Sequence, residues 1–227
     1  MTTRTTRRGR HGEAGMTMIA VMGVMAIFAI ALLAVAPSVQ QEVQREKELE
    51  SIRRGEEIAY AIQQYVVANN GSKLPQSIDD LLEGIPQGTK KRQILRASAA
   101  TDPLSEDGKW RLIKADPKII AAFAKRVQDY NNGLLPSNPT KHLDKYSVII
   151  VNSINTGDES ASAEPEEDTE VVTEDTPFIG VASQSRSKSV LTYYGIENHS
   201  KWIFTPLFRG VGNTRPVRKS AFENSIR

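Results

Sequence analysis

The chain has 227 residues, and its 29 Lys and Arg residues nearly balance 27 Asp and Glu residues, giving a net charge of +2. A charge so close to zero produces no uniform field that would steer the chain to nucleic acid, so we expect no nucleic-acid partner. Cysteine is absent, which excludes disulfides, cysteine-ligated zinc and thiol nucleophiles.

The first predicted element is an apolar helix at residues 16–36, where Thr17 is the only polar side chain. At a helical rise of ~1.5 Å per residue, this segment spans roughly 31 Å, about the thickness of a bilayer core. Arginines precede the segment, and the first charge after it is Glu42. The positive-inside bias therefore predicts a membrane span with a cytoplasmic N-terminus.

The helix is predicted to continue through 37–67 as an amphipathic second half, with Pro37 kinking it rather than ending it. Apolar residues recur there near helical spacing, namely Val39, Val43, Leu49, Ile52, Ala59, Ile62 and Val66. A cleaved secretory signal ending at Ala34-Val35-Ala36 is the alternative interpretation, but its apolar core is usually only ~7–15 residues long. A permanent single-span anchor with a charged stalk is a further alternative. Its extracytoplasmic head would then be a binding module that does not polymerise.

The residues after the long helix predict a small head with an antiparallel sheet. The long N-terminal helix is expected to pack on this sheet, which gives an α+β fold. The head is divided into a first part (68–152), a flexible acidic insert (153–175), C-terminal strands (176–208) and a flexible basic tail (209–227). We expect a loop with a short helix at 84–101 and a helix at 115–130 that Asp116-Pro117 opens. Strands are expected at 109–113, 146–152, 178–183, 189–194 and 202–204, with turns at 185–188 and 195–200.

We find no catalytic constellation in the sequence and predict that the protein is not an enzyme. His11, His142 and His199 do not form a pair at metal-ligand spacing. Neither a serine-centred nucleophile elbow nor a phosphate-binding loop is present. A secreted enzyme, which is another hypothesis for this chain, would need such a site.

The stretch Gly15-Met16-Thr17-Met18-Ile19 resembles the leader junction of type IV pilins and of type II secretion pseudopilins. The resemblance covers the basic leader (1–15), the junction, the apolar length and the position of Pro37. Downstream, the stretches 61–75, 77–82 and 102–113 are similar to the end of the pseudopilin long helix, the short helix that follows it, and the Asp-Pro turn before the first strand.

This resemblance implies cleavage by a prepilin peptidase between Gly15 and Met16, with N-methylation of Met16. The mature chain would sit in the bacterial inner membrane with its head in the periplasm, and would join other pseudopilins and the inner-membrane secretion platform. Its function would be that of a filament subunit without an active site. Ala20 replaces the glutamate that is usual in the family, which favours a minor or tip subunit. The predicted assembly positions on the helix are Thr17, Ala20, Gly23, Ala26, Ala29 and Pro37.

No cofactor is expected, although major pseudopilins often bind calcium. The acidic insert offers hard oxygen ligands at Asp158, Glu159, Glu166, Glu167 and Asp168. Their spacing matches no recognised calcium loop, so a solvated acidic linker is the default interpretation.

Overall fold

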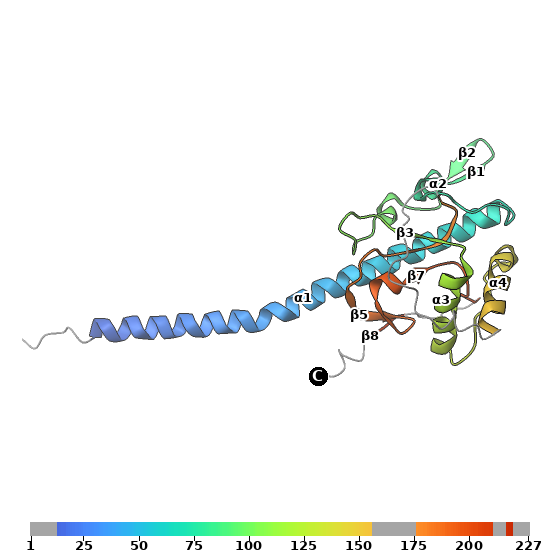
Figure 1. Ribbon diagram of the computed structural model, residues 1–227. Coiled ribbons are helices and arrows are strands. Elements are labelled where there is room, and N and C mark those ends of the chain that lie inside the picture. The colour runs from blue at the N-terminus through green and yellow to red at the C-terminus, as the bar shows by residue number, and fades with distance from the viewer. Residues whose placement is uncertain (1–12, 156–175, 211–216, 220–227) are drawn as a thin grey trace, which may run out of the picture. The chain divides into compact units, whose positions relative to one another are not determined.

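The computed structural model describes residues 13–155, 176–210 and 217–219, of which the side chains of 13–15, 33–39, 149, 152–155 and 217–219 are not described. Residues 1–44 and 45–227 are two separate units. The described residues combine α-helices with small antiparallel sheets, which confirms the predicted α+β class (Figure 1).

Helix α1 extends from Glu13 to Ala68 over 56 residues, and it continues through Pro37 as expected. In the second unit, one stripe of this helix is buried in the core, including Ile52, Ile58 and Ile62. The helix ends at an Asn-Gly turn, where the N–H of Gly71 donates to the carbonyl of Val66 at 2.7 Å. The positive φ of Gly71, 73°, is a conformation that glycine adopts without strain.

Two further helices start at the caps that the sequence provides. Helix α2 (Ile78–Glu83) begins after Ser77, whose hydroxyl accepts from the N–H of Asp80 in a capping box. Helix α3 (Pro117–Tyr130) begins after Asp116, whose carboxylate accepts from the N–H of Lys118. Both predicted helices are thereby confirmed.

Helix α4 (Asp144–Asn155) corrects the prediction of a strand at 146–152. The β-branched residues of this stretch favour a strand by propensity, but Leu143, Ser147 and Ile150 are buried at helical spacing while Val148 is exposed. Helices α3 and α4 pack side by side (Figure 1), so tertiary packing selects the helical period.

The described residues of the head form two three-stranded antiparallel sheets and one two-stranded sheet. The first has the order β3 (Arg111–Lys114), β4 (Phe178–Ala182) and β7 (Ile203–Phe204), with Leu112 opposite Val181 and Val181 opposite Phe204. The second has the order β6 (Ile196–Asn198), β5 (Lys188–Tyr193) and β8 (Val217–Lys219). The strands β3, β4, β5 and β7 confirm predictions, although the single predicted sheet is divided into two.

Four short strands were not predicted. Strands β1 (Ile85–Gln87) and β2 (Lys90–Arg92) form a hairpin in the predicted loop, whereas the 3₁₀ helix η1 (Ala97–Ala100) is the short helix expected there. Strand β6 lies in the predicted turn 195–200. Strand β8 lies in the tail (209–227) that was predicted to be flexible, and it pairs with β5. Each has only three residues, too few to show an alternating pattern, so strand pairing alone defines it.

Aromatic side chains fill the space between the sheets and the second half of α1. The rings of Trp110 and Phe204 meet edge to face with centroids 5.8 Å apart, and Tyr193 lies 5.0 Å from Phe204. All three are buried. Because Phe204 also covers Gly55, a Cβ atom at Gly55 would come within 2.2 Å of its ring.

Candidate functional site

The first half of α1 exposes an apolar surface on every side. The side chains of residues 16–32 are all exposed, including Met16 at 76%, Ile19 at 74% and Leu32 at 71%. A helix that is apolar all round belongs in lipid or in a bundle of similar helices. We call residues 16–32 the apolar helix and treat it as the candidate functional surface.

The predicted junction and assembly positions lie on α1. Because α1 begins at Glu13, the bond between Gly15 and Met16 lies within its first turn. A Cβ atom added at Gly23 would meet nothing within 4 Å. Packing within the described chain therefore does not explain why this position lacks a side chain. Thr17, Ala20, Ala26 and Ala29 are likewise exposed, while the side chain of Pro37 lies outside the described residues.

A search of the described residues for a helix with both the length and the apolarity of a membrane span finds none. The predicted span, 16–36, includes residues 33–36, whose side chains are not described.

The second half of α1 buries a carboxylate that the sequence analysis missed. Glu48 is fully buried, whereas its neighbour Leu49, assigned to the apolar stripe, is 43% exposed. The buried stripe therefore includes Glu48, Ser51, Ile52 and Gly55. A helical-wheel comparison of Glu48 with Ser51 and Ile52 would have suggested this position, but a charged residue there reads as solvent-facing.

The Glu48 carboxylate joins α1 to the second sheet. It accepts hydrogen bonds from the N–H groups of Val190 at 2.9 Å and Leu191 at 2.7 Å, and it lies 2.9 Å from Nε2 of His199. Burial alone would raise the pKa of Glu48, but the hydrogen bonds from His199, Val190 and Leu191 outweigh it and lower the pKa below its usual value.

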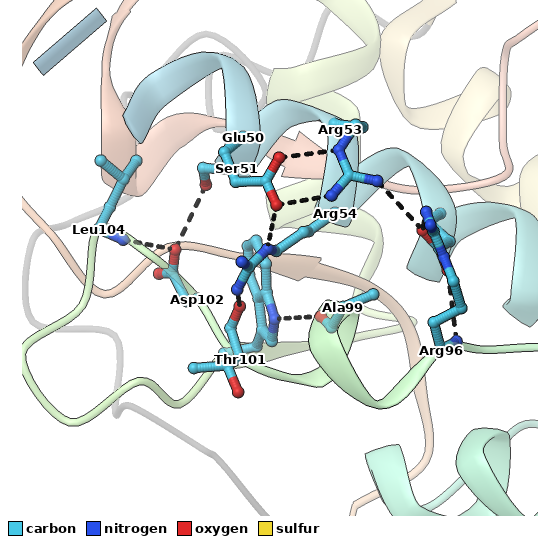
Figure 2. Close-up of polar contacts among 11 residues, drawn as sticks. Glu50, Ser51, Arg53, Arg54, Arg96, Ala99, Thr101, Asp102 and Leu104 are labelled. Atoms are coloured by element: carbon cyan, nitrogen blue, oxygen red, sulfur yellow. Dashed lines mark hydrogen bonds and ion pairs between the residues drawn. The ribbon is translucent and has the colours of Figure 1, made fainter. Parts of the chain in front are cut away.

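Asp102 is a second buried carboxylate beside α1 (Figure 2). It accepts from the hydroxyls of Ser51 at 3.3 Å and Ser183 at 2.6 Å, and from the N–H of Leu104 at 3.0 Å. Burial raises the pKa of Asp102 because these donors only partly offset its desolvation. Asp102 thus links α1 to the residue that follows β4 through two hydroxyl groups and one backbone N–H group.

Two more carboxylates of α1 hold distant parts of the head. Glu56 accepts from the hydroxyl of Tyr193 at 2.5 Å and pairs with Arg209, whose Nε donates to the carbonyl of Thr205 at 2.6 Å. Glu57 pairs with Arg96 just before η1. In Figure 2, Glu50 lies between Arg53 and Arg54, and Arg54 reaches the carbonyl of Thr101 at 2.9 Å.

The remaining predicted site residues are distributed as follows. The five candidate calcium ligands, Asp158, Glu159, Glu166, Glu167 and Asp168, lie outside the described residues, as does His11. His142 is exposed in the 3₁₀ helix η2 (Lys141–Leu143). His199, in the 3₁₀ helix η3 (His199–Lys201), is buried against Glu48 and Trp202. Within 13–155, 176–210 and 217–219, no three His, Asp or Glu residues are grouped as metal ligands would be.

Comparisons of the chain with protein-family models, with curated proteins and with solved structures give no match.

Proposed function

We propose that this chain is a pilin-like structural subunit: a prepilin peptidase removes residues 1–15, and the mature chain assembles into a filament through the apolar helix. The machine would be a type II secretion system or a related system that uses type IV pilin-like subunits. The observation that carries this proposal is the exposure of apolar side chains all around residues 16–32.

Lipid tails and the apolar helices of other subunits remove such a surface from water in the same way, by covering it with apolar groups. A subunit that leaves the membrane for a filament needs a helix that can exchange one for the other. Gly23 supports the assembly role, because its missing side chain opens a place for the close approach of a neighbouring helix.

Three carboxylates that join the second half of α1 to the rest of the head support the mechanical part of the proposal. A filament subunit must transmit force between its helix and its head without separating the two. Glu48 accepts from β5, and Glu56 pairs with Arg209 in the segment after β7. Asp102 accepts from Ser51 of α1 and from Ser183, the residue after β4. Such contacts would resist separation of the helix from the head.

Processing is tested by mass spectrometry of the chain expressed with and without a prepilin peptidase. We expect a mature N-terminus at N-methylated Met16, and a Gly15→Leu variant that retains the leader. Gly12→Leu, the same change three residues earlier in the leader, is the matched control and should be processed. An intact leader in the presence of the active peptidase, or a start after Ala36, would contradict the proposal.

Assembly is tested separately with engineered cysteines, which are unique because the natural chain has none. Ile27→Cys, on the apolar helix, should form cross-linked pairs in membranes when the secretion machinery is present. Tyr60→Cys is a control at an exposed position of the second half of α1. A processed chain in which the two cysteines cross-link equally would argue against assembly through the apolar helix.

A further inference from the structure

A groove of about 440 Å³ lies between the end of α1, the β1–β2 hairpin and the segment before η2. Its apolar lining includes Tyr60 and Val67 of α1 and Ile85 and Pro86 of β1. Tyr60 is 60% exposed and Val67 is 38% exposed, so the described chain leaves this lining uncovered. A groove of this size can accept side chains of another polypeptide.

The groove also contains polar groups that are only partly bonded within the described chain. Nη2 of Arg92 donates to Oε1 of Gln64, which is a neutral amide, and none of the described residues that line the groove carries a carboxylate. The Oγ1 atom of Thr140 is buried and has no hydrogen-bond partner in the described chain. Because buried hydroxyl groups are nearly always hydrogen-bonded, the groove offers a hydrogen bond and a positive charge to a polar group from outside.

The turn that ends α3 presents an apolar side chain that could fill such a groove. Leu134 is 74% exposed, more than any other large apolar side chain in the described part of residues 45–227. Its turn is fixed by hydrogen bonds from the N–H of Gly133 to the carbonyl of Gln128 at 2.8 Å, and from Nε2 of Gln128 back to the carbonyl of Gly133 at 3.0 Å. A side chain on a turn that is already ordered loses little conformational entropy on binding.

The charges of this turn and of the groove are complementary. The C-terminal end of a helix carries a partial negative charge, and the side chain of Asp129 beside the turn is exposed. Lys125 and Arg126, one turn earlier on α3, already interact with other groups of the chain. Arg92 is the charged side chain among the described residues that line the groove.

We infer that Leu134 of one copy of the chain inserts into the groove of a second copy, with the end of α3 against Arg92 and Thr140. The two surfaces belong to different parts of the chain, so each copy can present its turn to one neighbour and its groove to another. A contact of this kind repeats from copy to copy and generates an open filament unless a rotation closes it into a ring. The inference rests on the proposed function, because it names a contact between the heads of such a filament. It places residue 60 of one copy near residue 134 of the next and not near residue 60, so Tyr60→Cys remains a valid control.

The experiment cross-links two full-length chains, each with one cysteine, that are expressed together in membranes with the secretion machinery. An affinity-tagged chain carries Ser137→Cys, three residues after Leu134, and an untagged chain carries Gln87→Cys in the groove; both positions are exposed. With a short bis-maleimide reagent, we expect the mixed pair to exceed both pairs of identical chains several-fold. Leu134→Asp, added to the tagged chain, should reduce the mixed pair about tenfold because it removes the buried apolar group. Val148→Asp, the same kind of change at a 54% exposed position of α4, should reduce it less than twofold.

Equal amounts of mixed and identical pairs, equal losses in Leu134→Asp and Val148→Asp, or capture of a different protein by Gln87→Cys would overturn the inference. Ile27→Cys separates its failure from that of the proposed function. Cross-linking through Ile27→Cys without a mixed pair would reject the contact between heads and leave the filament standing, whereas loss of both would also contradict assembly. Tryptophan fluorescence in urea checks that each variant is folded, and both aspartate substitutions lie at exposed positions.

Discussion

The two halves of α1 reverse the usual relation between polarity and burial. In residues 16–32, Met, Ile, Val, Leu and Phe side chains are exposed, whereas in residues 45–68 the carboxylate of Glu48 is fully buried. Glu48 is buried because three donors compensate its charge. The apolar residues are exposed because nothing in the described chain covers them. The contrast shows that available partners, and not side-chain polarity alone, decide burial.

The largest expected effect tests the buried half. Glu48→Ala leaves the N–H groups of Val190 and Leu191 without their acceptor and the His199 ring without its partner, so we expect the free energy of unfolding to fall by about 3–5 kcal/mol. Glu46→Ala, at an exposed position two residues earlier, should cost less than about 0.5 kcal/mol. Urea unfolding followed by tryptophan fluorescence measures both, and similar losses would mean that the Glu48 contacts contribute little.

Two glycines of α1, Gly23 and Gly55, sharpen the comparison. Gly55→Ala would place a methyl group 2.2 Å from the buried ring of Phe204, so we expect a loss of about 2 kcal/mol from overpacking. Gly23→Ala meets open space and should leave the stability of the head unchanged. If the apolar helix packs on the same helix of other subunits, Gly23→Ala should nevertheless reduce cross-linking when it is combined with Ile27→Cys. Equal stability of the two variants would refute the assigned packing of Gly55.

The two buried carboxylates should respond to pH in opposite directions. The pKa of Glu48 is lowered on folding, so its contribution to stability is present above its usual pKa of 4.5 and is lost as the pH falls through the folded-state value. The pKa of Asp102 is raised, so its charged form weakens the fold as the pH rises above its usual value of 3.8.

The difference in free energy of unfolding between Asp102→Asn and the natural chain should therefore favour the variant more at pH 7 than at pH 4. At pH 7 we expect this difference to stay within about 1 kcal/mol, because the two serine hydroxyls can reorient. Urea unfolding of this variant and of the natural chain between pH 3 and pH 7 measures the effect. A variant curve parallel to the natural one would show that Asp102 does not titrate as described.

The smallest effect is expected at Glu50. Hydrogen bonds from Arg53 and Arg54 lower its pKa to about 2. The side chain is 34% exposed, so water screens the pair, and Glu50→Gln should cost less than about 0.5 kcal/mol. The same urea assay tests this value, and a loss comparable to that of Glu48→Ala would mean that exposure does not separate the two glutamates.

Local signals in the sequence predicted much of the fold. The cap at Asp116-Pro117 was sufficient for α3, because a cap and its helix lie within a few residues of one another. Helix α2 was instead expected from the resemblance of residues 77–82 to a short helix. The strands β3, β4, β5 and β7 were visible as short apolar runs between turns. In contrast, the run at 146–152 was assigned to a strand because its β-branched residues were weighed above its helical spacing.

The partners of the buried carboxylates could not be predicted from the sequence. Glu48 is 142 residues away from Val190 and 151 from His199 along the chain, and nothing near Glu48 indicates that these donors surround it. The same holds for Ser51 and Ser183, which meet at Asp102.

The sequence by itself determined the long helix, its apolar first half and the capped helices of the head, because hydrophobic periodicity and capping act over a few residues. Only the tertiary structure decided that Glu48 is inside and Leu49 outside, that residues 144–155 are helical, and that β8 pairs with β5. The physical reason is that burial of a charge, or pairing of a three-residue strand, depends on donors, acceptors and packing surfaces supplied from distant parts of the chain.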